Sequence, residues 1–257
     1  MGCDVFQIHW RHHLDSANDY YNFTHPHVLC APDAYKHRLG NFQTCGTGRS
    51  TGPRLAVLHV PVYEAIVGPG KDDPTAEIVA KYLADPPENR LDAAKYGRRY
   101  ASVHATCDSD SYVLCLPADG KCWGCGNWIT AEDSWEIEIG GMGTEPPDYW
   151  NGEIGKAKLT QAARAHIKSI WLVYGDDWIN KIVPSQKARI DATGRFVSAG
   201  WLQHRDVPYW TGSAWAQPPE DNIKAGQHAD IHKDFPMETF FMVLAAEVNR
   251  SVKEGVK

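Results

Sequence analysis

Short apolar runs predict the strands of this chain. The run RLAVLHV at 54–60 is aliphatic and β-branched, and it sets His59 at the end of the predicted strand. From 134 to 139 the sequence SWEIEI alternates, so Glu136 and Glu138 lie on one face of a second predicted strand. By itself, a face with two glutamates is typical of the solvated face of an edge strand.

Two more patterns extend the predicted sheet. The stretches 100–107 and 111–116 flank a turn at 108–110 and predict a β-hairpin. A further strand is expected at 197–203, and it leads directly to His204. The second of these patterns therefore ends at a residue that can bind a metal or transfer a proton.

Apolar residues at helical spacing predict three helices. The first begins at Asp73, with Pro74 at the first helical position. A second runs from Thr160 to Tyr174 and ends at Gly175, and a third closes the chain through Val252. The apolar positions of the first two helices are Ile78, Val79, Tyr82, Leu83, Ala163, Ile167, Ile170, Trp171 and Tyr174.

The segments between these elements predict the rest of the architecture. We expect 142–155 to be a long loop and 176–196 to be polar and loop-like, with a turn at 191–194. His166, on the second helix, is expected to be a surface or helix-side residue. The alternation of strands and helices indicates an α/β fold with a mixed central β-sheet flanked by helices.

Composition limits the domain count and the class of partner. A chain of 257 residues can bury a sizeable core, and we predict an N-terminal extension at 1–53 and one domain at 54–257, separated by the Gly-rich stretch 46–53. With 26 basic and 32 acidic residues, the net charge of −6 gives no support for binding nucleic acid or an anionic membrane. We expect a monomer.

The N-terminus predicts where the protein is made. Its first residues, MGCDVFQIHWRHHLD, contain no apolar stretch of the export-signal type, and no run reaches the length of a membrane-spanning helix. We therefore predict a cytoplasmic product without a signal peptide. The seven cysteines are expected to be reduced thiols in that compartment.

A cluster of metal-ligand residues lies in the last quarter of the chain. His204 follows a predicted strand, and His228, Asp230, His232 and Asp234 follow within thirty residues. Catalytic zinc usually has three protein ligands of the nitrogen, sulfur or carboxylate type and one open position. The upstream residue that best completes such a set is His59, at the end of its own strand.

Four sequence blocks resemble one enzyme family. They are LAVLHV at 55–60, ASVHATCDSDSYVLCLPADGKCWGCGN at 101–127, SWEIEIGG at 134–141, and GWLQHRDVP with HADIHKDFPM at 200–237. Their residues and order resemble the zinc-dependent N-acetylmuramoyl-L-alanine amidases of bacteria and phages and the related peptidoglycan recognition proteins. The resemblance covers about residues 54 to 241.

The resemblance implies a ligand set and a catalytic residue. Zinc would be held by His59, His204 and Asp230, with Asp234 as the competing third ligand. Glu138 matches the catalytic glutamate of the family, whereas Glu136 stands where the family has glycine. His228 occupies the position of the family's oxyanion-stabilising cation, so both His228 and Glu138 are predicted catalytic residues.

The second block supplies the predicted substrate contacts, which are His104, Trp123 and Asn127. His104 has an alternative interpretation as a strand histidine that is hydrogen-bonded within the sheet. Gly124 replaces the histidine that follows the tryptophan in the family, and Val103 replaces a tyrosine that some relatives have.

The resemblance implies a peptidoglycan hydrolase with a zinc cofactor, and a phage endolysin in particular. Two alternatives remain open. The first is a non-catalytic peptidoglycan-binding protein on the same fold. The second is a zinc or thiol protein built around the C-x-x-C of Cys122 and Cys125, although Gly124 and Gly126 favour a loop there over a redox helix.

Overall fold

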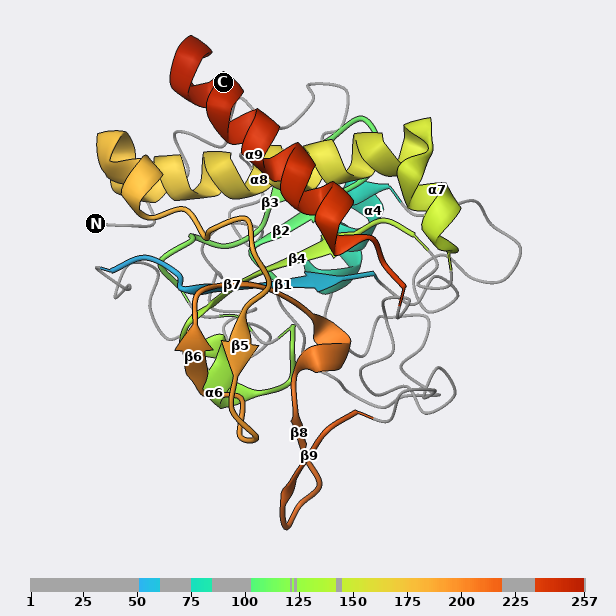
Figure 1. The fold of residues 1–257 in the computed structure, drawn as a ribbon, viewed down its shortest axis with the longest axis vertical. Coiled ribbons are helices and arrows are strands. Elements are labelled where there is room, and N and C mark those ends of the chain that lie inside the picture. Colours follow the sequence, from blue (N-terminus) through green and yellow to red (C-terminus); the bar gives the residue numbers. More distant parts are fainter. Residues whose placement is uncertain are drawn as a thin grey trace.

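A mixed five-stranded sheet forms the centre of the computed structural model (Figure 1). The structure describes residues 51–60, 75–84, 103–120, 122, 124–141, 145–218 and 234–256. Within these residues the strand order is β3-β2-β4-β1-β7. The bounds are β1 Leu55–His59, β2 Ala105–Cys107, β3 Tyr112–Leu114, β4 Ser134–Ile139 and β7 Gly200–Gln203.

Parallel pairing sets which strand ends meet. β4 and β7 both pair in parallel with β1, and β2 pairs in parallel with β4 and antiparallel with β3. The carboxyl ends of β1, β4 and β7 therefore lie at one edge of the sheet. Because side chains alternate between the two faces of a strand, His59 lies on the same face as its registered partner Glu138.

Helices cover the face of the sheet opposite His59. α8, Glu153–Tyr174, and α9, Met237–Glu254, cross over this face, with the short α7, Pro147–Asn151, before α8 (Figure 1). Aromatic and aliphatic side chains of the strands and of both helices form the main core there, including Leu58, Trp135, Ile137, Trp201 and Phe240. None of the described helices is long and apolar enough to cross a membrane.

The face that carries His59 has a smaller core and shorter elements. α4, Ala76–Ala84, packs beside β2, where Thr106 donates a hydrogen bond of 2.7 Å to the carbonyl of Ala76. α6, Trp128–Ala131, and the ribbon of β5, Arg189–Ile190, and β6, Phe196–Ser198, lie below β1 and β7 in Figure 1.

Short connecting elements complete the described fold. Two 3₁₀ turns are η4, Gly175–Asn180, and η5, His204–Asp206. A second ribbon, of β8, Tyr209–Trp210, and β9, Trp215–Ala216, projects from the body of the molecule (Figure 1).

Most predicted elements are confirmed. The strands at 54–60 and 134–139, the hairpin of β2 and β3, the end of α8 at Gly175 and the C-terminal helix are all present. Together they confirm the predicted α/β fold with a mixed central sheet. The predicted starts at Asp73 and Pro74 lie outside the described residues.

Three predictions were wrong in detail, and the edge-strand interpretation of 134–139 does not hold either. β4 lies between β2 and β1, so it is not an edge strand, and Glu136 is fully buried. Residues 147–155 form α7 and the start of α8 instead of a loop, so the second predicted helix begins at Glu153 and not at Thr160. His166 is fully buried in the core. The predicted strand 197–203 is divided between two sheets at Gly200, whose φ is +143° and whose Cβ, if it had one, would lie 2.3 Å from the carbonyl of Gln186.

Candidate metal centre

Two histidines meet at the carboxyl edge of the sheet. His59 ends β1, and His204 follows β7, the neighbouring strand. Their Nδ1 atoms are 3.0 Å apart, and the ring planes are tilted by 56°. Both residues are buried. The structure thus brings these two predicted ligands together.

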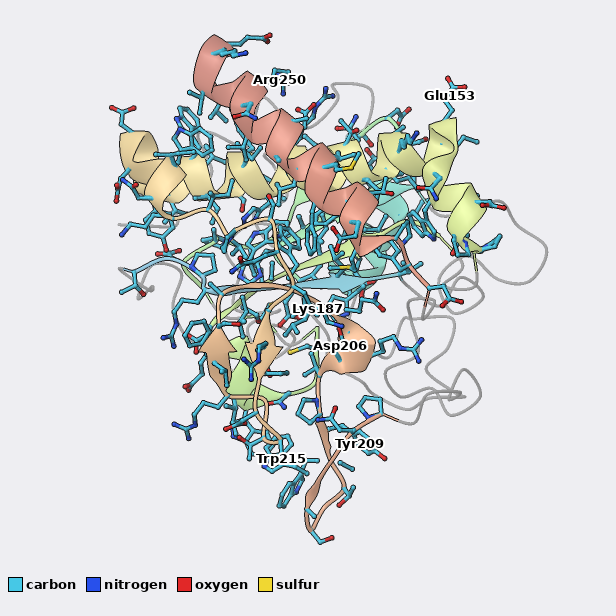
Figure 2. The ribbon with its side chains drawn as sticks, in the orientation of Figure 1. Glu153, Lys187, Asp206, Tyr209, Trp215 and Arg250 are labelled. Atoms are coloured by element: carbon cyan, nitrogen blue, oxygen red, sulfur yellow. The ribbon has the colours of Figure 1, made fainter. Side chains whose placement is uncertain are left out.

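Local hydrogen bonds hold His204 at the start of η5. The carboxylate of Asp206 accepts from the backbone N–H of Gln203, at 3.2 Å, and the two residues form a capping box around His204. Lys187 lies 3.9 Å from the same carboxylate, and Figure 2 shows both side chains beside η5. Asp206 thus connects the η5 turn to the backbone of Gln203 and to the side chain of Lys187.

The far nitrogen of each ring faces an acceptor. His59 Nε2 lies 3.4 Å from Oε2 of Glu136, and His204 Nε2 lies 3.2 Å from the carbonyl oxygen of Cys125. An acceptor at Nε2 favours the tautomer that carries its proton there. In that tautomer the two Nδ1 lone pairs point at each other across 3.0 Å, an arrangement that a metal ion bound between them would stabilise.

The histidine pair fits a tetrahedral metal. Zinc–nitrogen bonds of about 2.0–2.1 Å at a tetrahedral angle separate two ligand nitrogens by about 3.3 Å. The observed 3.0 Å is close to that value. Metal-bound histidines usually donate their other N–H to a carboxylate or a backbone carbonyl. His59 faces the first kind of acceptor and His204 the second.

The remaining predicted ligands are placed differently. His228 and Asp230 lie outside the described residues. Asp234 is described and exposed, and no group of three or more histidine, cysteine, aspartate or glutamate residues suited to a metal occurs in the described part of the chain. Asp234 therefore does not complete a three-ligand set with the histidine pair, and Asp230 stays a prediction.

Glu138 lies beside the pair on the neighbouring strand. Its Cα is in register with that of His59, and its side chain is half-buried on the same face of the sheet. This arrangement brings a carboxylate to the edge where the two histidines meet. Its catalytic role stays a prediction.

Glu136, one step deeper on the same face, was not predicted as a site residue. Its carboxylate accepts hydrogen bonds from the hydroxyl of Ser134 at 2.8 Å and from the backbone N–H of Cys125 at 2.7 Å. Burial alone raises the pKa of this carboxyl, but its contacts with His59 and Cys125 outweigh burial and lower the pKa from 4.5 to about 2. The alternation of the strand predicted that Glu136 and Glu138 share one face of the sheet. It did not predict that this face is buried at Glu136.

Two predicted substrate contacts are buried in the described structure. His104 is fully buried, accepts from the backbone N–H of Glu136 at 3.0 Å and lies 3.3 Å from the sulfur of Cys122. Asn127 is also buried, and its side chain caps α6. These contacts agree with the sheet-histidine interpretation of His104. Trp123 lies outside the described residues.

The two thiols of the C-x-x-C motif are buried beside the site. Cys122 and Cys125 are buried free thiols. Burial, followed by the nearby Glu136 carboxylate, raises the pKa of both thiols well above 9.0. Both are therefore protonated at neutral pH, unlike the reactive thiolates of redox motifs.

Comparison with known proteins gives fold-level likenesses only. No family model and no curated protein matches the chain. Among solved structures, the hydrolase AmiA of Staphylococcus aureus is similar over 78% of this chain and 77% of its own, with 17% identity and a TM-score of 0.43. The catalytic domain of PlyG has 15% identity and a TM-score of 0.38 over 73% of this chain and 79% of its own. PlyL has 15% identity and a TM-score of 0.36 over 73% and 82%. Identities and TM-scores this low say nothing about function, which has to be argued from the residues of the site.

Proposed function

We propose that this chain is a zinc-dependent N-acetylmuramoyl-L-alanine amidase. It would hydrolyse the amide bond between the lactyl group of N-acetylmuramic acid and the L-alanine of the peptidoglycan stem peptide. The observation that carries the proposal is the buried pair of His59 and His204, whose Nδ1 atoms face each other at 3.0 Å. The order of the four sequence blocks supports the family and its substrate.

In this proposal His59, His204 and Asp230 hold the metal. When bound, zinc lowers the pKa of water toward about 7 and polarises a carbonyl group. The chain supplies the rest. Glu136 and the carbonyl of Cys125 orient the two rings, and the buried position of the pair keeps its electrostatic interactions strong.

Glu138 acts as the general base and then as the general acid. It takes a proton from the water that attacks the amide carbon, and it passes that proton to the nitrogen as the C–N bond breaks. The products are a lactyl carboxylate and a free L-alanine amino group. His228 would donate a hydrogen bond to the oxyanion that forms in between.

The biological setting that we propose is the bacterial cell wall. The resemblance to endolysins favours an enzyme made in the cytoplasm of a phage host and released onto peptidoglycan at lysis. The stem peptide and the glycan strand are then its partners.

Product analysis on purified peptidoglycan tests the proposal. Wild-type protein should generate new L-alanine amino termini and glycan strands whose N-acetylmuramic acid residues carry free lactyl carboxylates, both identified by mass spectrometry. His204→Ala should abolish both products, and Glu138→Gln should lower their rate of formation about 10²–10⁴-fold. Glu153→Gln is the matched control, because Glu153 is an exposed carboxylate at the start of α8 and distant in sequence from the pair. Binding to peptidoglycan without any cleavage product would favour the non-catalytic binding protein instead.

A further inference from the structure

The buried carboxylate of Glu136 is connected to both histidines. Its Oε2 faces His59 at 3.4 Å and also accepts the backbone N–H of Cys125 at 2.7 Å. The carbonyl of the same Cys125 faces His204 at 3.2 Å. One side chain and one backbone unit therefore link the far nitrogens of both rings.

The cost of burying this carboxylate indicates a specific role. Glutamate is rarely fully buried unless it is paired, and an ionised carboxylate loses much solvation energy in a core. Here Ser134 and Cys125 donate hydrogen bonds to the carboxylate, and His59 Nε2 lies 3.4 Å from it. The fold thus places a carboxyl group directly behind the His59 ring, whose other nitrogen faces His204.

We propose that Glu136 is a positioning residue of the histidine pair. It fixes His59 in the tautomer with the proton on Nε2, directs the Nδ1 lone pair toward His204, and offsets part of the charge of a bound dication. The inference rests on the proposed zinc site, and it concerns a residue that departs from the family pattern. Removal of a carboxylate that hydrogen-bonds a metal-bound histidine typically lowers metal affinity about 10–100-fold.

Two variants separate charge from hydrogen bonding. Glu136→Gln keeps the shape and one acceptor oxygen but removes the charge, whereas Glu136→Met removes the acceptor at similar volume. Zinc affinity is measured by competition with a chromophoric chelator on the full chain. We expect a loss of a few-fold in Glu136→Gln and of 10-fold or more, about that of other such carboxylates, in Glu136→Met.

The ¹⁵N shifts of the His59 ring in the metal-free chain provide a second readout that needs neither zinc nor activity. The Nε2-protonated form should dominate in wild type and lose its excess in Glu136→Met. Unchanged zinc affinity together with an unchanged tautomer in both variants would overturn the proposal. An inactive wild type with a Glu136-dependent tautomer would overturn the amidase proposal and leave this one standing.

A different observation concerns the surface. Trp128 of α6 and Trp210 of β8 are 45% and 44% exposed, and both pack on Trp215 of β9, with ring centroids 4.7 and 5.4 Å from its own. The other large exposed apolar residues of the described chain are aliphatic side chains or a methionine. We call Trp128, Trp210 and Trp215 the tryptophan cluster. Figure 2 shows Trp215 on the projecting ribbon.

The tryptophan cluster is tied to the candidate metal centre. The side chain of Asn127 caps α6 and also donates a hydrogen bond of 2.7 Å to the carbonyl of Pro208, the residue directly before β8. In the site, the carbonyl of Cys125 contacts the ring of His204. Asn127 follows Cys125 by two residues, and Pro208 follows His204 by four. The segments that carry the cluster are therefore hydrogen-bonded to each other and are continuous in sequence with Cys125 and His204.

Chemistry favours a neutral sugar as the ligand. The residues between the two ribbon tryptophans are Thr211, Gly212, Ser213 and Ala214, so the ribbon carries hydroxyl groups and no charge. The rings pack too closely to enclose a quaternary ammonium ion as an aromatic cage would. We infer that the tryptophan cluster stacks on the glycan strand of the proposed substrate. Exposed indoles combine an apolar face with an N–H donor, which suits pyranose rings.

Sedimentation with insoluble peptidoglycan tests this inference without catalysis. In the Glu138→Gln background, Trp210→Ala and Trp128→Ala should each reduce the bound fraction several-fold, and N-acetylglucosamine oligomers should quench tryptophan fluorescence and compete for binding. Met242→Ala is the control, because Met242 is 71% exposed on α9. Unchanged peptidoglycan binding would overturn the inference, as would cluster-dependent binding to neutral lipid vesicles or self-association in place of sugar binding.

Discussion

At the scale of single residues, the acceptor behind each histidine decides what its other nitrogen can bind. His59 faces a carboxylate and His204 faces a carbonyl, so both Nδ1 atoms are directed into the space between the rings. Neither contact could be foreseen from the sequence. The C-x-x-C that supplies Cys125 suggested a zinc or thiol function only as an alternative, whereas its backbone contacts both Glu136 and His204.

Glu138→Gln should separate chemistry from metal binding. The glutamine keeps the size of the side chain but cannot take a proton, so peptidoglycan hydrolysis should fall about 10²–10⁴-fold. Zinc content should stay at the wild-type level, because Glu138 is not a proposed ligand. Metal analysis and product release on the same sample check both statements, and a variant that loses zinc as well would assign Glu138 to the metal instead.

His166 should make the fold sensitive to acid. Burial, followed by the charge of His104, lowers the pKa of His166 from 6.5 to about 3. The unfolded chain binds this proton below about pH 6.5, whereas the folded chain does not, so the free energy of unfolding falls as the pH decreases from 6.5 toward 3. The slope should approach 1.4 kcal/mol per pH unit, about the value for one proton.

Urea denaturation between pH 7 and 5 measures this slope. Val183 donates its backbone N–H to His166 Nε2 at 3.1 Å, and the amide oxygen of His166→Gln can accept the same hydrogen bond without titrating. The slope of unfolding free energy against pH should therefore be smaller in the variant, by about the contribution of one proton. Equal slopes in both proteins would show that His166 does not contribute.

At the scale of elements, a turn holds α6 against the ribbon that follows the site. Gly194 has φ of +90°, and a Cβ there would lie 2.4 Å from Nδ2 of Asn127 and 2.5 Å from the hydroxyl of Thr130. Asn127 in turn donates to the carbonyls of Thr193 and Pro208. The turn, α6 and the ribbon are therefore one hydrogen-bonded unit.

Gly194→Ala should destabilise the protein more than Gly212→Ala does. Both glycines have positive φ, which costs a residue with a Cβ about 1–2 kcal/mol. Only Gly194 also has side chains in the way, since nothing lies within 4 Å of a Cβ at Gly212. Equal unfolding free energies for the two variants, measured in urea, would contradict the tight packing described at Gly194.

Local sequence signals predicted most elements, and failed where distant contacts decide. Strands β1 and β4 were found from their apolar patterns, but the central position of β4 depends on pairing with β1 and β2. The segment 142–155, which contains Pro146 and Pro147, was expected to be a long loop. Pro147 instead occupies the first position of α7, where the missing N–H has no helical partner to lose.

At the scale of the whole molecule, the parallel sheet brings distant segments to one edge. His59, Glu138 and His204 are separated by more than 60 residues along the chain but end neighbouring parallel strands. The sequence could predict this juxtaposition because each residue closes a recognisable strand. It could not fix the third ligand, because Asp230, which lies outside the described residues, closes no predicted strand.

Zinc stoichiometry tests the central claim most directly. Metal content per chain is measured by mass spectrometry on wild type, His204→Ala, and Cys122→Ser with Cys125→Ser, all purified identically. The account predicts one zinc per chain in wild type, loss of zinc in His204→Ala, and retention in the double cysteine variant, whose Cys125 backbone contacts remain. Zinc retained in His204→Ala but lost from the cysteine variant would contradict it.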